Sequence, residues 1–214
     1  MSSVLPCGDI FLYDNKKGVG MKVCNDDAEI KKRLKNYNPK RTGRRLPVNE
    51  QFKPEKLKCY LFKGLTESDL LARTYYLLKA VDEITDEMNV NKFAVCQSGC
   101  AYCCKIPVDV TLMEAELIAY ETGKVINNHN SIKRISYKNS YCPFLDVDNA
   151  KCTIYSVRPL ACRCFYSLDH YKYCKNVEEH HLITTVDSNS KWEQIESLLL
   201  TLSNNKVADI REWF

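Results

Sequence analysis

Hydrophobic positions recur with helical spacing in the middle of the chain. Apolar side chains appear at intervals of three and four residues between Leu70 and Met88. The preceding run, Thr66-Glu67-Ser68-Asp69, is typical of a helix N-terminus, so we predict an amphipathic helix from Thr66 to about Met88. A second helix is predicted to begin at Thr111-Leu112-Met113-Glu114, which is a capping-box pattern, and to stop at Gly123.

The C-terminal part of the chain has the same kind of periodicity. Apolar residues from Trp192 to Leu202 lie on one face of an expected helix, and Ser203-Asn204-Asn205 interrupts it. The apolar spacing resumes from Val207 to Phe214. We therefore expect a helical tail that packs on the rest of the protein, although its two terminal aromatic residues also suit an interface for a partner.

Shorter patterns predict a small β component. Lys105 to Val110 is expected to be extended, and Asp148-Asn149 is a turn signal between Tyr141 and Tyr155. A β-hairpin over that stretch would bring Cys142 and Cys152 close together. Pro159 suits the first turn of a helix. The expected fold is mainly α with a small β-hairpin.

The N-terminal third has a different character. Ile10 to Tyr13 and Val19 to Val23 flank a turn-rich stretch and suit a β-hairpin. Residues 31–58 carry eleven Lys and Arg against two Glu and are interrupted by prolines. This segment is either a solvated linker or an arm that contacts nucleic-acid phosphates. We predict an irregular basic N-terminal arm over residues 1–65 and a helical cysteine-cluster domain over residues 66–214.

Cysteines change the picture, because the 214-residue chain has twelve of them. Cys96-Gln-Ser-Gly-Cys100-Ala-Tyr-Cys103-Cys104 places four thiols within nine residues. Adjacent cysteines do not easily form a disulfide with each other, whereas a tight turn can aim several thiolates at one metal. Gly99 can take the positive φ that such a turn needs. Metal ligation is therefore favoured over disulfides, and the isolated Cys7 and Cys24 are expected to be ordinary thiols.

The expected cellular setting supports metal ligation. The N-terminus lacks the charged and apolar regions of a signal peptide, and no stretch approaches the roughly 18 apolar residues of a membrane span. We expect a cytoplasmic protein without membrane contact, in a reducing compartment where cysteine clusters usually bind metals. His129 and His170 are expected at the surface.

Three ordered motifs resemble the CxxCxxCC, or YkgJ-like, cysteine-cluster family over about residues 92–176. The first is Cys96-x₃-Cys100-x₂-Cys103-Cys104 followed by Pro107 to Ala115. The second is Cys142-Pro-Phe-Leu, and the third runs from Cys152-Thr-Ile-Tyr155 to Cys162-Arg163. Cys174 matches a less constant downstream cysteine of the family, and Cys164 is additional.

The resemblance implies a zinc- or iron-chelating domain and no particular reaction. One relative in function is the flagellin lysine-N-methylase, in which the domain accompanies methyl transfer from S-adenosylmethionine. This chain has no glycine-rich Rossmann-type loop and only 7 glycines, so no feature of the sequence indicates methyl transfer. Capping explains Glu114 and solvation explains Glu116 better than catalysis does, and we expect no catalytic residue.

Candidate metal ligands come from both cysteine-rich stretches. An iron–sulfur cluster, [4Fe–4S] in particular, is favoured over zinc, although a set of thiolates without histidine suits both. We expect the side chains of Tyr155, Arg158 and Arg163 to support the site by packing, by charge or by anchoring carbonyls. The expected ligands are Cys96, Cys100, Cys103, Cys104, Cys142, Cys152 and Cys162, with Cys174 as a possible addition.

Three functions remain open on the sequence. The first is a non-enzymatic component of a larger complex, such as a virion assembled in the cytoplasm, with protein partners. The second is an iron–sulfur enzyme that modifies proteins, such as a lysine N-methyltransferase. The third is a nucleic-acid-binding protein that uses residues 31–58.

Overall fold

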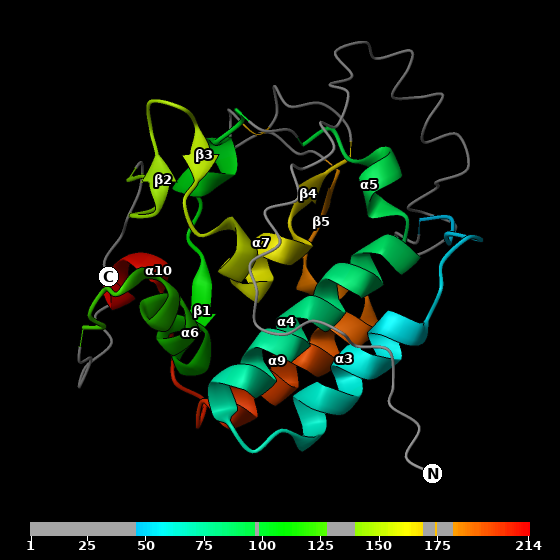
Figure 1. Ribbon diagram of the computed structural model, residues 1–214. Coiled ribbons are helices and arrows are strands. Elements are labelled where there is room, and N and C mark those ends of the chain that lie inside the picture. The colour runs from blue at the N-terminus through cyan, green and yellow to red at the C-terminus, as the bar shows by residue number, and fades with distance from the viewer. Residues whose placement is uncertain (1–45, 97–98, 128–139, 169–173, 175–181) are drawn as a thin grey trace.

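The computed structural model describes residues 46–96, 99–127, 140–168, 174 and 182–214. Helices and short antiparallel strand pairs build this part of the chain (Figure 1). The helices are α3 (Glu55–Thr66), α4 (Leu70–Glu87), α5 (Val90–Phe93), α6 (Leu112–Thr122), α7 (Leu160–Cys164), α9 (Ser190–Leu202) and α10 (Ile210–Trp213). The strands are β1 (Asp109–Thr111), β2 (Leu145–Asp146), β3 (Lys151–Cys152), β4 (Tyr166–Ser167), β5 (Ile183–Thr184) and β6 (Val207–Asp209).

Helix α4 is the centre of the fold and confirms the first predicted helix. Asp69 caps it by accepting a hydrogen bond from Ala72 N at 2.6 Å, so the helix begins at Leu70 and not at Thr66. Leu77, Val81 and Ile84 are fully buried along one face. That face explains why α4 packs against α3, α6, α7 and α9.

Helix α3 was missed by the sequence analysis, which expected irregular structure up to residue 65. Leu57 and Tyr60 belong to the buried apolar face of this helix. Lysines at neighbouring positions hide that apolar pattern in the sequence. The close approach of α3 to α4 needs Gly64, because a Cβ there would lie 2.8 Å from Leu77 Cδ2. The expected boundary between residues 65 and 66 therefore falls inside α3. The expected hairpin in residues 1–30 and most of the basic segment lie outside the described residues.

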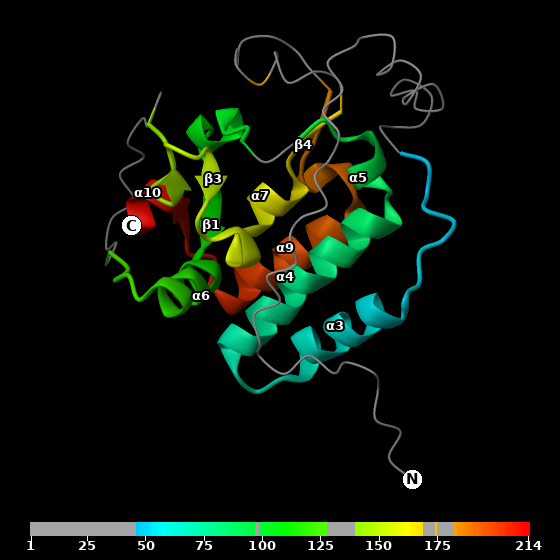
Figure 2. The same cartoon turned by 45° about the horizontal axis from the view of Figure 1, so that its top comes forward.

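Helices α3, α4 and α9 lie side by side in both views (Figure 2). Trp192, Ile195 and Leu199 of α9 are almost completely buried against this layer. The predicted helix over Trp192–Leu202 is confirmed. None of the helices in the described residues has both the length and the hydrophobicity that a membrane span requires.

Helix α6 confirms the second predicted helix at both ends. Thr111 and Glu114 form the capping box, and Gly123 ends the helix with a φ of 69°. Glu114 is also buried, and its second carboxylate oxygen accepts the N–H of Leu160 at 2.7 Å. The same side chain therefore caps α6 and holds the start of α7.

The tail after α9 corrects the prediction that helical structure resumes at Val207 after the polar break. Val207–Asp209 forms strand β6, which pairs antiparallel with β1, and helix α10 follows only from Ile210. Trp213 is buried and donates a hydrogen bond to Val110 O at 2.9 Å. Strand pairing across about a hundred residues overrides the helical spacing of these apolar side chains.

The remaining strands frame the cysteines. Strands β2 and β3 form the predicted hairpin, in which Leu145 pairs with Cys152. Strands β4 and β5 pair Tyr166 with Thr184. Each of these strands is only two residues long, so other interactions must fix their positions.

Candidate metal centre

The cysteines come from segments that lie apart in the sequence. Cys96 and Cys100 lie between α5 and β1, and Cys103 and Cys104 follow in a 3₁₀ turn over Tyr102–Lys105. Gly99 adopts a φ of 89°, as the sequence predicted. Cys142 precedes the hairpin, Cys152 lies in β3, and Cys162 lies in α7.

Electrostatic interactions connect these thiols. The Cys103 thiol interacts with those of Cys96, Cys100, Cys152 and Cys162. Cys96 also interacts with the thiol of Cys174. Thiols from both cysteine-rich stretches thus lie close enough to interact, and Cys103 interacts with thiols of each stretch.

Backbone N–H groups point at several of the sulfur atoms. Ser167 N donates to Cys96 Sγ at 3.3 Å. The sulfurs of Cys100, Cys142 and Cys152 each accept from the backbone two residues further along the chain, at Tyr102, Phe144 and Ile154. Such hydrogen bonds favour the thiolate over the thiol, and they are a regular feature of metal–thiolate sites.

The surroundings nonetheless favour neutral thiols while no cation is present. Burial is the main cause that raises the pKa of Cys96, to about 12. A hydrogen bond with the Cys104 thiol is the first cause that raises the pKa of Cys103. Burial likewise raises the pKa of Cys100, Cys142, Cys152 and Cys162. A bound metal cation would reverse this balance, because thiolates are the ligating form.

The donor set fits zinc or iron in its chemistry. Soft thiolates are the ligands that select zinc and iron–sulfur clusters. Within the described residues, no three His, Cys, Asp or Glu side chains are spaced as a finished metal site. A metal would therefore have to draw the thiols closer together, as expected where ligation and folding are coupled.

The comparison with protein families agrees with this chemistry. Residues 95–189 match the model of the CxxCxxCC family, described as a putative zinc- or iron-chelating domain. This CxxCxxCC segment confirms the resemblance expected over about residues 92–176 and extends it towards α9. No curated protein and no solved structure matches the chain.

Arg163 holds the backbone that leads into α7 of the CxxCxxCC segment. Its side chain, 3% exposed, donates to Ser156 O at 2.5 Å and to Arg158 O at 2.7 Å. It also forms an ion pair at 2.5 Å with Asp82 of α4. Arg163 therefore anchors carbonyls and ties the cysteine segments to the helical layer.

Arg158 has different surroundings. Its guanidinium lies 4.2 Å from the centre of the exposed Tyr155 ring and interacts electrostatically with Cys103, Cys152 and Cys162. Its Nε atom is buried without a hydrogen-bond partner. The geometry therefore suits charge compensation of thiolates, whereas Arg163 is engaged with carbonyls and Asp82.

Two further cysteines have different surroundings. Cys164 is fully buried in the core, and its electrostatic partners are Arg158, Arg163, Asp82 and Glu114. Cys104 lies next to Cys103, and its carbonyl accepts the N–H of Cys142 at 2.8 Å. His129 and His170 fall outside the described residues.

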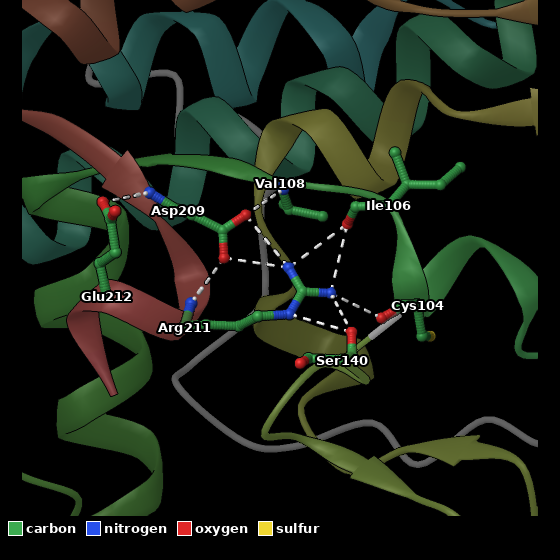
Figure 3. Close-up of polar contacts among 7 residues, drawn as sticks. All are labelled: Cys104, Ile106, Val108, Ser140, Asp209, Arg211 and Glu212. Atoms are coloured by element: carbon green, nitrogen blue, oxygen red, sulfur yellow. Dashed lines mark hydrogen bonds and ion pairs between the residues drawn. The ribbon is translucent and has the colours of Figure 1, made fainter. Parts of the chain in front are cut away.

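Sequence reasoning missed the polar groups of the tail that reach this region. Arg211 of α10 donates to the carbonyls of Cys104, Ile106 and Ser140 while it pairs with Asp209 (Figure 3). Its charge also opposes the effect of burial, which is the main cause of the raised pKa of Cys142. Because Arg211 bonds main-chain oxygens, no pattern of neighbouring residues reveals it.

Proposed function

We propose that this chain is a metal-binding protein whose cysteine thiolates hold an iron–sulfur cluster, with zinc as the alternative occupant. One observation supports this proposal. Thiols from distant segments interact with one another, and backbone N–H groups donate hydrogen bonds to several of their sulfur atoms. An all-thiolate donor set with N–H···S hydrogen bonds suits a [4Fe–4S] cluster, which spreads its ligands over a larger cage than one zinc ion.

The ligands would come from the connected thiols. Four thiolates complete either a tetrahedral zinc site or one [4Fe–4S] cluster, so the full set exceeds what one centre needs. Cys164 is left out, because it lies in the apolar core with charged groups as its electrostatic partners. The candidates are Cys96, Cys100, Cys103, Cys104, Cys142, Cys152 and Cys162, with Cys174 as an addition.

The role we propose for the bound metal is structural, in a component of a larger protein complex. The strongly buried charged groups of this region have structural partners: Glu114 holds Leu160, Arg163 holds Ser156 and Arg158, and Asp209 holds Val108. These contacts support a structural role for the charged groups. A cytoplasmic complex, such as a virion assembled there, fits this role.

The test is the metal content of protein purified without oxygen. Iron together with acid-labile sulfide and broad visible absorption is the expected result, and stoichiometric zinc would support the alternative occupant. Protein that folds with neither metal would contradict the proposal. Specific binding of S-adenosylmethionine would contradict the structural role. Salt-dependent RNA or DNA binding that is lost without residues 31–58 would instead point to nucleic acid as the partner.

A further inference from the structure

Arg211 connects two cysteine-bearing segments that lie far apart in the sequence. Its guanidinium donates to Cys104 O at 2.9 Å and to Ser140 O at 3.0 Å (Figure 3). It also reaches Ile106 O at 3.4 Å. Cys104 ends the Cys96–Cys104 run, Ile106 follows it, and Ser140 belongs to the segment that enters the β2–β3 hairpin.

The guanidinium is held firmly in its own position. Asp209 pairs with it through both carboxylate oxygens, at 3.0 and 3.1 Å. One of those oxygens also accepts Val108 N at 2.7 Å, beside strand β1. The Arg211 side chain is only 5% exposed. Solvent therefore screens these contacts little. Nη1 of Arg211 makes both contacts with Asp209, while Nε and Nη2 donate to the carbonyls of Ser140 and Cys104.

The carbonyl of Cys104 shows why this position matters for the thiols. It accepts Arg211 Nη2 and, at 2.8 Å, the backbone N–H of Cys142. The same oxygen thus joins the cysteine run to the start of the hairpin. A shift of Arg211 would release this junction and separate thiols that both segments bring to the cluster.

We propose that Arg211 is a positioning residue of the metal centre, and that β6 and α10 belong to the metal-binding unit although they lie outside the family match. The inference rests on the proposed metal-binding function. Arg211 binds no metal itself. It holds the Cys104 and Cys142 segments next to each other in the chain that the metal enters.

Lysine cannot replace Arg211 in this position. Arginine presents five N–H donors in a planar fork, whereas lysine offers three donors on one nitrogen. An R211K chain would keep the positive charge near Asp209. Its single ammonium nitrogen could not donate to Asp209 and to the separated carbonyls at the same time. Charge and fork geometry can therefore be distinguished by experiment.

The experiment compares R211Q, R211K and a control by Co²⁺ titration of the full-length, reduced and metal-stripped chain. The control is R73Q, because Arg73 also donates from its side chain to a carbonyl, Gly64 O at 3.1 Å, but within the helical layer. Visible absorption reports thiolate ligation of Co²⁺, and urea unfolding of the same samples reports stability.

We expect R211Q to weaken Co²⁺ binding about tenfold or more, as is typical when a group that orients metal ligands is lost. R211K should recover only part of that loss, and R73Q should bind Co²⁺ like the wild type. Unchanged Co²⁺ affinity and absorption in R211Q, with only a lower urea midpoint, would overturn the inference alone. If R211Q does not fold, R211K decides the question by the same criteria. A wild-type chain that binds no Co²⁺ through thiolates would overturn the proposed function as well.

Discussion

The helical layer and the cysteine segments are stabilised in different ways. In α3, α4 and α9, long apolar stripes are almost completely buried, with Leu77, Ile84 and Trp192 at or near zero exposure. The cysteine segments consist of 3₁₀ turns, two-residue strands and the five-residue helix α7. Buried Arg163, Arg211 and Glu114 hold them to the rest of the protein by hydrogen bonds.

This difference indicates that the two regions depend on metal to different degrees. Burial of apolar side chains alone can stabilise the helical layer. Segments as short as those around the cysteines bury little apolar surface, so they need cross-links from charged side chains and, in our proposal, from a metal. Metal removal should therefore loosen the cysteine segments before the helices.

The largest expected effect is the loss of a ligand. C100S should release the metal and unfold residues 92–176, because the free energy of ligation, about 10–16 kcal/mol for structural zinc, is folding free energy in such sites. Metal analysis and amide hydrogen exchange of the purified variant would measure both results. C164A is the control, since Cys164 lies outside the thiol cluster, and it should retain its metal. A folded C100S with full metal content would exclude Cys100 as a ligand.

A cavity in the helical layer should lower stability without releasing the metal, in contrast to C100S. L77A is expected to lower the free energy of unfolding by about 2–5 kcal/mol, because Leu77 is fully buried against α3. Urea unfolding would give this value. The metal content of the folded L77A variant should remain unchanged. Loss of metal from a variant whose helices stayed intact would show that metal binding depends on packing in the helical layer.

Breaking the link between the two regions should have a smaller effect. R163A removes the donor for two carbonyls and leaves the partly exposed Asp82 without its ion pair, so we expect a loss of about 2–3 kcal/mol. K191A removes the exposed ion pair with Glu87 and should cost less than about 1 kcal/mol. Equal losses for the two variants in urea unfolding would contradict the anchoring role of Arg163.

The smallest effect concerns pH. Burial is the main cause that raises the pKa of Glu114 above 4.5, so the folded chain binds this proton more tightly than the unfolded chain does. Its contribution to stability is complete below about pH 4.5 and decreases as the pH rises towards the folded pKa. In urea titrations at several pH values, the stability advantage of wild type over E114Q should therefore shrink with rising pH. An advantage that grew with pH would show the opposite shift.

Local signals made much of the fold predictable. Helix α4 has a long apolar stripe, α6 has its capping box and Gly123, and the β2–β3 hairpin has an obvious turn. In each case, neighbouring residues carry the information. Helix α3 was missed because lysines lie among its apolar positions and Pro54 precedes it directly, although Leu57 and Tyr60 belong to the core.

Contacts between distant residues were not predictable in the same way. Strand β6 exists because Ala208 pairs with Val110, and three residues carry too short a pattern to reveal that pairing. Arg211 reaches carbonyls 71 to 107 residues away in the sequence. Cysteine spacing suggested which thiols bind metal, and that ligand set stays a prediction. The groups that position the thiols required the folded chain.

X-ray absorption spectroscopy at the metal edge of anaerobically purified protein tests the central claim most directly. If cysteine thiolates from distant segments close around zinc or iron, the first shell will contain sulfur at about 2.3 Å, with four sulfurs around each metal atom. In a zinc site, cysteine thiolates should supply all of these sulfurs. In an iron–sulfur cluster, cysteine thiolates and inorganic sulfide should supply them together. A shell of nitrogen and oxygen atoms, or sulfur in fewer than half of the positions, would contradict the account.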